Sequence, residues 1–189
     1  MVDYKTFKKG YLNEWVDQSQ AARKAAEELA MKEVKPSLQD KYAYKDINQD
    51  LIFILNGHKV EFKAENEKKA DGDIYFTWYE AIERFGEPDF KNGWRLPTKE
   101  EFGALCKYPH EFKDEQGVFD NRLYLPAAGY RNCSGNLFDV GSDSNYWSST
   151  PNGLNRAWLL YFYSDSDSVG MYSNYQDTAL SVRLVREVK

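Results

Sequence analysis

Residues 157–164, AWLLYFYS, constrain the fold more than any other stretch of this chain. Successive side chains of a β-strand point to opposite faces, so a strand with one face in water alternates apolar and polar residues. Here Leu160 and Phe162 alternate with Leu159, Tyr161 and Tyr163, and both sets are apolar or aromatic. We expect the first set to close the core and the second set to face outward. The alternative is that another element or a subunit covers the second set.

A β-hairpin and two short helices precede this strand. An Asn-Gly pair at 56–57 joins two apolar runs, and this pair favours the type I′ turn of a hairpin. Thr77 with Glu80, and Thr98 with Glu101, have the spacing of capping boxes and predict the starts of two helices. Helices and strands are therefore segregated along the chain, which predicts the α+β class.

Short strands separated by Gly, Ser, Asn and Pro complete the chain. The strand candidates are residues 122–132, 145–150, 156–164 and 180–188.

Near the N-terminus, residues 10–34 carry apolar side chains at three- and four-residue steps and predict a further amphipathic helix. This helix either packs on its own domain or serves oligomerisation or attachment to a larger assembly. We expect an N-terminal helical segment at 1–48 and the main domain at 49–189.

Charge and composition exclude several functions. The net charge is −5 and no basic stripe is present to meet phosphates, so we expect no nucleic-acid partner. No apolar run approaches the length of a membrane span, so no membrane insertion is expected, and the N-terminus lacks the apolar region of a signal peptide. Cys106 and Cys133 are too few for a disulfide framework or a zinc site, although a single bridge between them stays open.

Catalytic and metal-binding motifs are missing from the sequence. Nothing beside His58 or His110 resembles a nucleophile or a metal-ligand spacing, and no phosphate-cradling glycine loop occurs. The stretch SDSDS at 164–168 lacks the Gly and the distal Glu of an EF-hand loop. We therefore expect a protein that is not an enzyme and that has no cofactor and no metal site.

Lys and Glu are unevenly distributed. Neither occurs in residues 117–186, a region that carries only Asp and Arg as full charges and is rich in Tyr, Ser, Asn and Gly. This boundary in composition separates the late strands and loops from the rest of the chain.

Four phrases in order carry a family resemblance: NGWRLPTKEEFGAL, LYLPAAGYRN, YWSST and AWLLYFYS followed by SVRLV. The chain resembles C-type-lectin-like variable proteins of diversity-generating retroelements. These proteins are related to the Fibrobacter succinogenes major paralogous domain proteins and share their fold with formylglycine-generating enzymes. The resemblance implies a small twisted mixed β-sheet with two helices and long irregular loops. The reactive cysteine pair of the related enzymes has no counterpart here.

In this family, mutagenesis at template adenines rewrites exposed positions while a framework is kept. The resemblance implies a variable region at about 143–177. The implied framework is Trp94, Arg95, Leu96, Pro97, Tyr146, Trp147, Ser148, Ser149, Ala157, Leu160, Phe162, Ser164, Ser181, Val182 and Arg183. The implied ligand-binding positions are Asn152, Leu154, Asn155, Leu159, Tyr161, Tyr163, Asp165, Ser166, Asp167, Ser168, Tyr172, Asn174 and Tyr175.

The genetic code offers a check on these positions. Mutagenesis of the adenines in Asn codons yields residues such as Asn, Asp, Ser, Tyr, Gly and Leu, but never Lys, Glu, Gln, Met or Trp. All the implied positions obey this rule. Met171 and Gln176 do not, so we expect them to belong to the framework or to have a different template.

The composition of the implied positions is that of an antibody paratope. Tyrosine supplies rigid amphipathic contact area at low entropic cost, while Ser and Asn adapt their hydrogen bonds. We expect a diversified surface that recognises a protein or glycan ligand on a cell surface, in a phage tail or virion or on a bacterial surface as an adhesin. The alternative is a structural protein that uses the same face for contacts in a homo-oligomer or a larger virion assembly.

Overall fold

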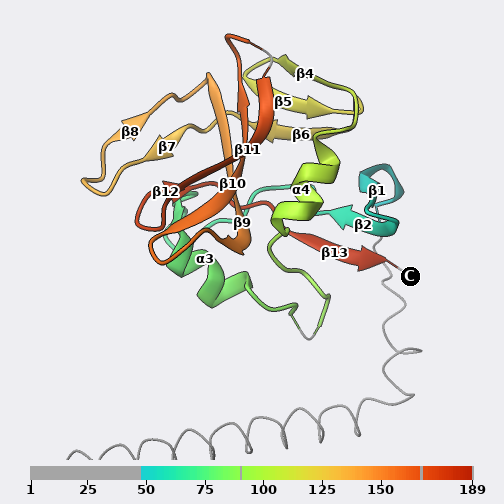
Figure 1. Cartoon of the computed structure of the whole chain (residues 1–189), viewed down its shortest axis with the longest axis horizontal. Helices are drawn as coiled ribbons and strands as arrows, with labels where there is room; N and C mark the ends of the chain where they lie inside the picture. The colour runs from blue at the N-terminus through green and yellow to red at the C-terminus, as the bar shows by residue number, and fades with distance from the viewer. Residues whose placement is uncertain (1–47, 90, 167, 189) are drawn as a thin grey trace, which may run out of the picture. The chain divides into compact units, whose positions relative to one another are not determined.

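The computed structural model describes residues 48–188 except residues 90 and 167 (Figure 1). All of them belong to one unit, which runs from Asp46 to Lys189. The helix expected over 10–34 lies outside the described residues.

The first strands form the hairpin that the Asn-Gly pair predicts. A 3-10 turn, η1 (Gln49–Leu51), leads into β1 (Ile52–Leu55), which pairs antiparallel with β2 (His58–Phe62). Asn56 and Gly57 both have positive φ, 51° and 88°, as a type I′ turn requires. The last strand, β13 (Val185–Val188), pairs antiparallel with the other edge of β2.

Both helices begin at the predicted capping boxes. Helix α3 (Trp78–Phe85) follows Thr77, whose hydroxyl accepts from the Glu80 amide while the Glu80 carboxylate accepts from the Thr77 amide. Helix α4 (Lys99–Leu105) follows Thr98, which exchanges the same two hydrogen bonds with Glu101. These bonds satisfy backbone donors that the first turn of a helix leaves free.

Four small sheets complete the described part of the chain. Three have three strands, in the orders β1-β2-β13, β11-β10-β9 and β4-β5-β6, and one has four, in the order β3-β12-β7-β8. The bounds are β3 (Phe76–Thr77), β4 (His110–Lys113), β5 (Gln116–Phe119), β6 (Leu123–Pro126), β7 (Tyr130–Arg131), β8 (Leu137–Phe138), β9 (Asp143–Pro151), β10 (Arg156–Tyr163), β11 (Ser168–Tyr175) and β12 (Ala179–Leu180).

The α+β class is therefore confirmed, but the expected single mixed sheet is replaced by these four. All their ladders are antiparallel, and the parallel element is a single bridge between Tyr146 and Ser181.

The sequence did not predict the β4–β5 hairpin or the strand β11. Strands β4 and β5 form a hairpin whose turn residues, Asp114 and Glu115, both have positive φ although neither is glycine. Strand β11 covers residues 168–175, where the sequence indicated an irregular loop. It pairs along the whole length of β10, from Tyr163 opposite Ser168 to Arg156 opposite Tyr175.

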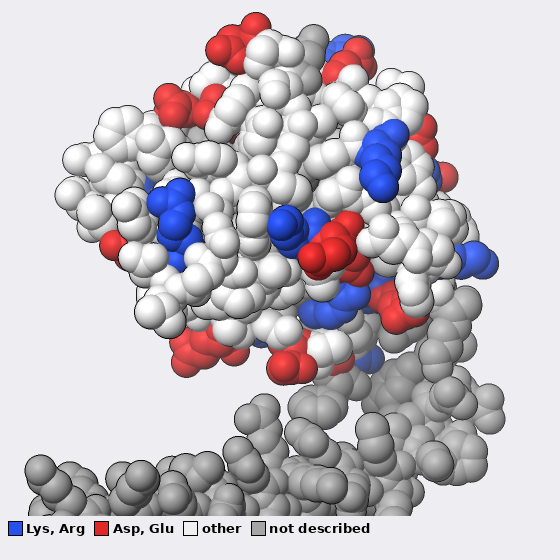
Figure 2. All heavy atoms as spheres, in the orientation of Figure 1, with Lys and Arg blue, Asp and Glu red and all other residues white. Residues whose placement is uncertain are grey.

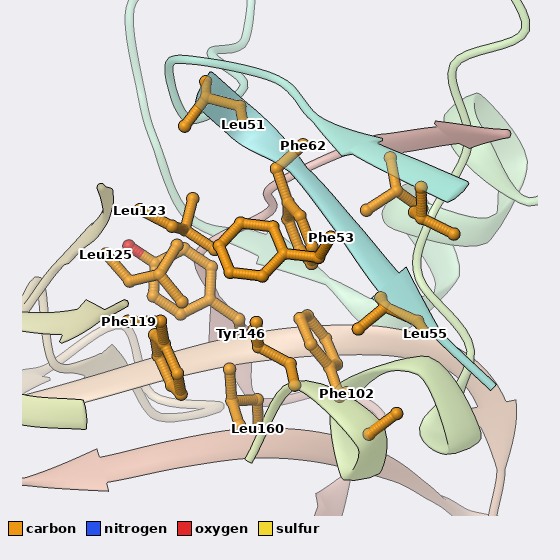
Figure 3. Packing of buried hydrophobic residues seen from close by; sticks show 14 of the residues in the cluster. Leu51, Phe53, Leu55, Phe62, Phe102, Phe119, Leu123, Leu125, Tyr146 and Leu160 are labelled. Atoms are coloured by element: carbon orange, nitrogen blue, oxygen red, sulfur yellow. The ribbon is translucent and has the colours of Figure 1, made fainter. Parts of the chain in front are cut away.

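Strand β10 lies between two hydrophobic clusters. Leu160 and Phe162 enter the first cluster, which packs the β1–β2 hairpin and α4 against the β9–β10 pair around Phe53 and Phe102 (Figure 3). Leu159 enters the second cluster together with Trp147, which lies opposite it on β9. The apolar character of both faces of residues 157–164 follows from this position between two clusters.

Candidate functional site

The structure corrects the expected orientation of Leu159. Its side chain is only 1% exposed and packs in the second cluster with Trp147 and Leu180, so it does not reach a ligand. At this position, other elements of the same domain cover the face that was expected to be free. Leu159 belongs with the framework.

The other implied ligand-binding residues are spread along the β10–β11 hairpin. Tyr161, Tyr163, Asp165, Ser166 and Ser168 lie toward its turn, Tyr172 lies at mid-strand opposite Leu159, and Asn174 and Tyr175 lie at the other end, which also carries Asn152, Leu154 and Asn155. Strands rise roughly 3.3 Å per residue, so the seven steps from residue 156 to 163 separate the two ends by about 20 Å. The side chain of Asp167 lies outside the description. Tyr161, Tyr163, Tyr172 and Asn174 lie on one face of the hairpin, whereas Tyr175 lies on the other face and Leu159 is buried, so the thirteen positions do not form one continuous patch.

Tyr161, Tyr163 and Tyr172, which we name the tyrosine cluster, lie on one face of the β10–β11 hairpin. The rings of Tyr161 and Tyr163 are stacked, with centroids 4.6 Å apart and planes at 26°. A Cβ at Gly170, opposite on β11, would lie 3.0 Å from the Tyr161 hydroxyl, so this glycine leaves room for the phenol to cross the neighbouring strand. Ser168 Oγ lies 3.5 Å from the same hydroxyl.

Exposure increases across the tyrosine cluster. Tyr161 is half-buried and packs against the second hydrophobic cluster, Tyr163 is half-buried, and Tyr172 is 52% exposed. Burial raises the pKa of the Tyr163 phenol, and the carboxylate of Asp143 raises it further, so this phenol stays neutral and can donate a hydrogen bond. The cluster thus offers exposed aromatic area and, at Tyr163, a neutral hydroxyl group.

At the opposite end of the hairpin, the exposed aromatic side chain lies on the other face of the sheet. Tyr175 is 53% exposed, but it lies three residues from Tyr172 on the same strand and therefore points to the other face of the sheet. The Arg156 guanidinium lies 4.7 Å from the centre of its ring. Leu154 is fully exposed in the loop between β9 and β10, and the carbonyl of Asn155 accepts from the Gln176 amide.

The two residues that break the codon rule both point inward. Gln176 is buried and donates from its amide to the Arg156 carbonyl at 3.0 Å. Met171 is partly buried against the first hydrophobic cluster. Most of the implied framework is also buried, including Tyr146 and Trp147, but Ser164 is exposed.

Sequence reasoning missed a second exposed surface, the β7–β8 hairpin. Leu137, Phe138 and Val140 are large, exposed and almost consecutive, and the Phe138 ring stacks on Tyr130 at 5.4 Å with planes at 20°. The available signal was two short apolar runs on either side of residues 132–136, which are rich in turn-forming residues. In Figure 2, the lobe over β7 and β8, at the left, is almost free of charged side chains.

The remaining cysteine and histidine side chains do not form a further candidate site among the described residues. Within residues 48–188, as far as they are described, no three His, Cys, Asp or Glu side chains converge as a metal site would require. Cys106 and Cys133 are both free, and burial raises the pKa of the Cys106 thiol to about 11. His58 pairs with Glu187 at 3.0 Å, and the His110 ring packs edge-on against Phe162. Neither α3 nor α4 has the length and hydropathy of a membrane span.

The described residues thus form an α+β scaffold with a mostly buried framework and exposed aromatic side chains on the β10–β11 hairpin. The chain belongs to the Lcl C-terminal domain family, which matches residues 46–186. This family is associated with variable proteins of diversity-generating retroelements, which indicates a role in ligand recognition. No curated protein matches the chain. No solved structure matches it either.

Proposed function

We propose that this chain is a non-catalytic recognition protein whose tyrosine cluster binds a protein or glycan ligand on a cell surface. The scaffold in this proposal is a C-type-lectin-like fold, and a retroelement diversifies the exposed positions within about 143–177. The protein acts as an adhesin or receptor-binding component of a phage tail or of a bacterial surface.

One observation carries the proposal: a single strand contributes both to the core and to the exposed aromatic surface. Phe162 is buried in the first hydrophobic cluster, while its neighbours Tyr161 and Tyr163 stack on each other on the opposite face. The strand is therefore held rigidly, and its tyrosines are presented with little freedom left to lose on binding. Rigid aromatic anchors of this kind dominate the energetics of antibody interfaces.

The distribution of buried residues supports diversification. Met171 and Gln176, which cannot arise from Asn codons by adenine mutagenesis, point inward, whereas Asp165, Ser166 and Tyr172 are exposed. Substitution at exposed positions away from buried contacts usually changes stability by less than about 0.5 kcal/mol. Such positions tolerate replacement while the framework keeps the fold.

Two tyrosines on the same strand give a matched test. Tyr172 and Tyr175 are almost equally exposed but point to opposite faces of β11. The fluorescently labelled chain is incubated with a panel of intact bacterial and animal cells, read by flow cytometry, and with a glycan array. We expect Tyr172→Ser to weaken binding at least tenfold and Tyr175→Ser to leave it within twofold, with both variants folded by circular dichroism.

Binding that survives Tyr172→Ser and Tyr163→Ser together would contradict the proposal. Light scattering on the unlabelled chain adds a second check. An obligate oligomer whose assembly is abolished by the same two substitutions would favour the alternative, a structural protein that uses this face for subunit contacts.

A further inference from the structure

We infer that the β7–β8 hairpin and the tyrosine cluster form one binding surface, whose partner is a protein that presents an Arg or Lys side chain between apolar groups. This inference deepens the proposed function and rests on it, because it names the chemistry of the ligand. It also extends the surface to residues 130–140, which lie before the implied variable region.

Backbone hydrogen bonds join the hairpin to the end of β10 that carries the tyrosines. The Gly129 amide donates to the Asp143 carbonyl at 2.9 Å, and the Asp143 amide donates to the Asp139 carbonyl at 3.0 Å. Asp143 is in turn opposite Tyr163 in the β9–β10 ladder. The base of the hairpin and the tyrosine cluster are therefore neighbours within a hydrogen-bonded framework, and a ligand can contact both.

The hairpin presents apolar surface that no described element covers. Leu137, Phe138 and Val140 are exposed, and Phe138 is held by its stack on Tyr130. Contiguous exposed apolar groups of this kind mark interaction sites on soluble proteins. Because the Tyr161–Tyr163 stack lies beyond the hairpin base, two pairs of stacked aromatic rings flank the residues at 139–143.

Carboxylates lie between the two aromatic stacks and select a cationic partner. Asp139 and Asp143 act electrostatically on both Tyr130 and Tyr163: burial raises the pKa of each phenol, and the two carboxylates raise it further. Burial also raises the pKa of Asp143, and Asp139 and Asp165 add to this effect. None of these three carboxylates takes part in an ion pair among the described residues.

The groups around these carboxylates also indicate which kind of cation binds. Among the described residues, no three His, Cys, Asp or Glu side chains converge as a metal site would require, so we take the cation to be a side chain of the partner protein. Arg and Lys side chains combine a charge with an apolar stem and bind over aromatic rings. An Arg or Lys flanked by apolar residues therefore satisfies the carboxylates, the stacked rings and the exposed hairpin together. The hairpin would supply this contact unchanged while the variable positions adjust the rest.

A pair of tripeptides that differ only in charge tests the inference. The probes are acetyl-Leu-Arg-Leu-amide and acetyl-Leu-citrulline-Leu-amide, because citrulline keeps the shape of arginine without its charge. Each is titrated into the full-length chain labelled with 15N, at low salt, and amide shifts are followed by NMR. We expect the arginine peptide to shift amides within 129–143 and 161–172 and to bind at least tenfold more tightly than the citrulline peptide.

Matched neutralisations complete the test. Asp143→Asn should weaken binding of the arginine peptide at least fivefold, while Asp177→Asn, an exposed acid beside the opposite end of the β10–β11 hairpin, should change it by less than twofold. Equal binding of the two peptides, shifts confined to other surfaces, or no shifts at all would overturn the inference. If a glycan or a neutral protein then binds cells or the array in a Tyr172-dependent manner, the proposed function stands and only the cationic partner is refuted.

Discussion

Replacing Leu159 with alanine tests whether this side chain is buried, as in the structure, or faces a ligand, as the sequence predicted. A ligand-facing leucine would cost almost nothing to remove, whereas the structure places it 1% exposed beside Trp147. The substitution deletes about three methylene equivalents, worth about 0.8 kcal/mol each, or roughly 2.4 kcal/mol in total. The neighbours are held by the β9–β10 ladder, so the cavity collapses only partly and adds to this cost. We expect a loss of about 3–4 kcal/mol in the free energy of unfolding.

Urea denaturation of the full-length chain, followed by tryptophan fluorescence, measures this loss. With a slope of about 2 kcal/mol per molar urea, a loss of 3–4 kcal/mol lowers the midpoint by roughly 1.5–2 M. Tyr172→Ala is the control, because Tyr172 lies on the same face of the sheet but is 52% exposed. Replacing an exposed side chain usually changes stability by less than about 0.5 kcal/mol, so we expect Tyr172→Ala to cost clearly less than Leu159→Ala.

Equal stability of Leu159→Ala and the wild type would refute the two-cluster account of β10. A loss from Tyr172→Ala as large as that from Leu159→Ala would refute the assignment of the tyrosine cluster to the surface. The predicted order also bears on diversification, because a retroelement that varied Leu159 freely would produce unfolded chains.

Three further predictions concern charge and glycine. Burial raises the pKa of Glu101, but hydrogen bonds from Arg95 and from Thr98 at the helix cap lower it more, so the net shift is downward. Glu101→Gln should therefore reduce the free energy of unfolding by about 1–3 kcal/mol at pH 7. In urea melts, this difference between variant and wild type should close as the pH falls below about 4.3. The pKa of Asp143 is raised in the folded state, so its ionisation destabilises the folded state above about pH 3.9. Asp143→Asn should therefore be at least as stable as the wild type at pH 7. A less stable variant would contradict this prediction. A Cβ at Gly117 would meet the buried Phe162 ring at 2.4 Å, so Gly117→Ala should lose about 1–3 kcal/mol, whereas Gly103→Ala, in open space on a helix, should gain about 0.5–1 kcal/mol by thermal melting.

Local signals in the sequence predicted the elements whose geometry depends on few residues. The Asn-Gly turn at 56–57 and the capping boxes at Thr77 and Thr98 are confirmed, because each is set by the chemistry of residues within one turn. The inward direction of Leu160 and Phe162 is confirmed for a similar reason, since strand alternation is local.

Long-range pairing explains what the sequence did not reveal. Strand β11 has no apolar alternation that is clear by itself, and it is a strand because β10 supplies its hydrogen bonds along eight residue pairs. The direction of Leu159 depends on whether α3, β3 and β12 come back over that face, which no feature of residues 157–164 indicates. The exposure of Phe138 likewise depends on a hairpin that extends away from the rest of its sheet.

The position of β10 between two hydrophobic clusters would also limit the diversification that we propose. Along one face of this strand, Leu159 is buried, while Tyr161 and Tyr163 are half-buried. We therefore expect an unsuitable replacement to cost more free energy of unfolding at Leu159 than at Tyr161 or Tyr163. Tyr172, on the edge strand opposite Leu159, is 52% exposed, so its replacement should cost less than that of Leu159. Under the proposed function, we expect variation at Tyr161, Tyr163 and Tyr172 and not at Leu159, because Leu159 anchors the strand in the second hydrophobic cluster.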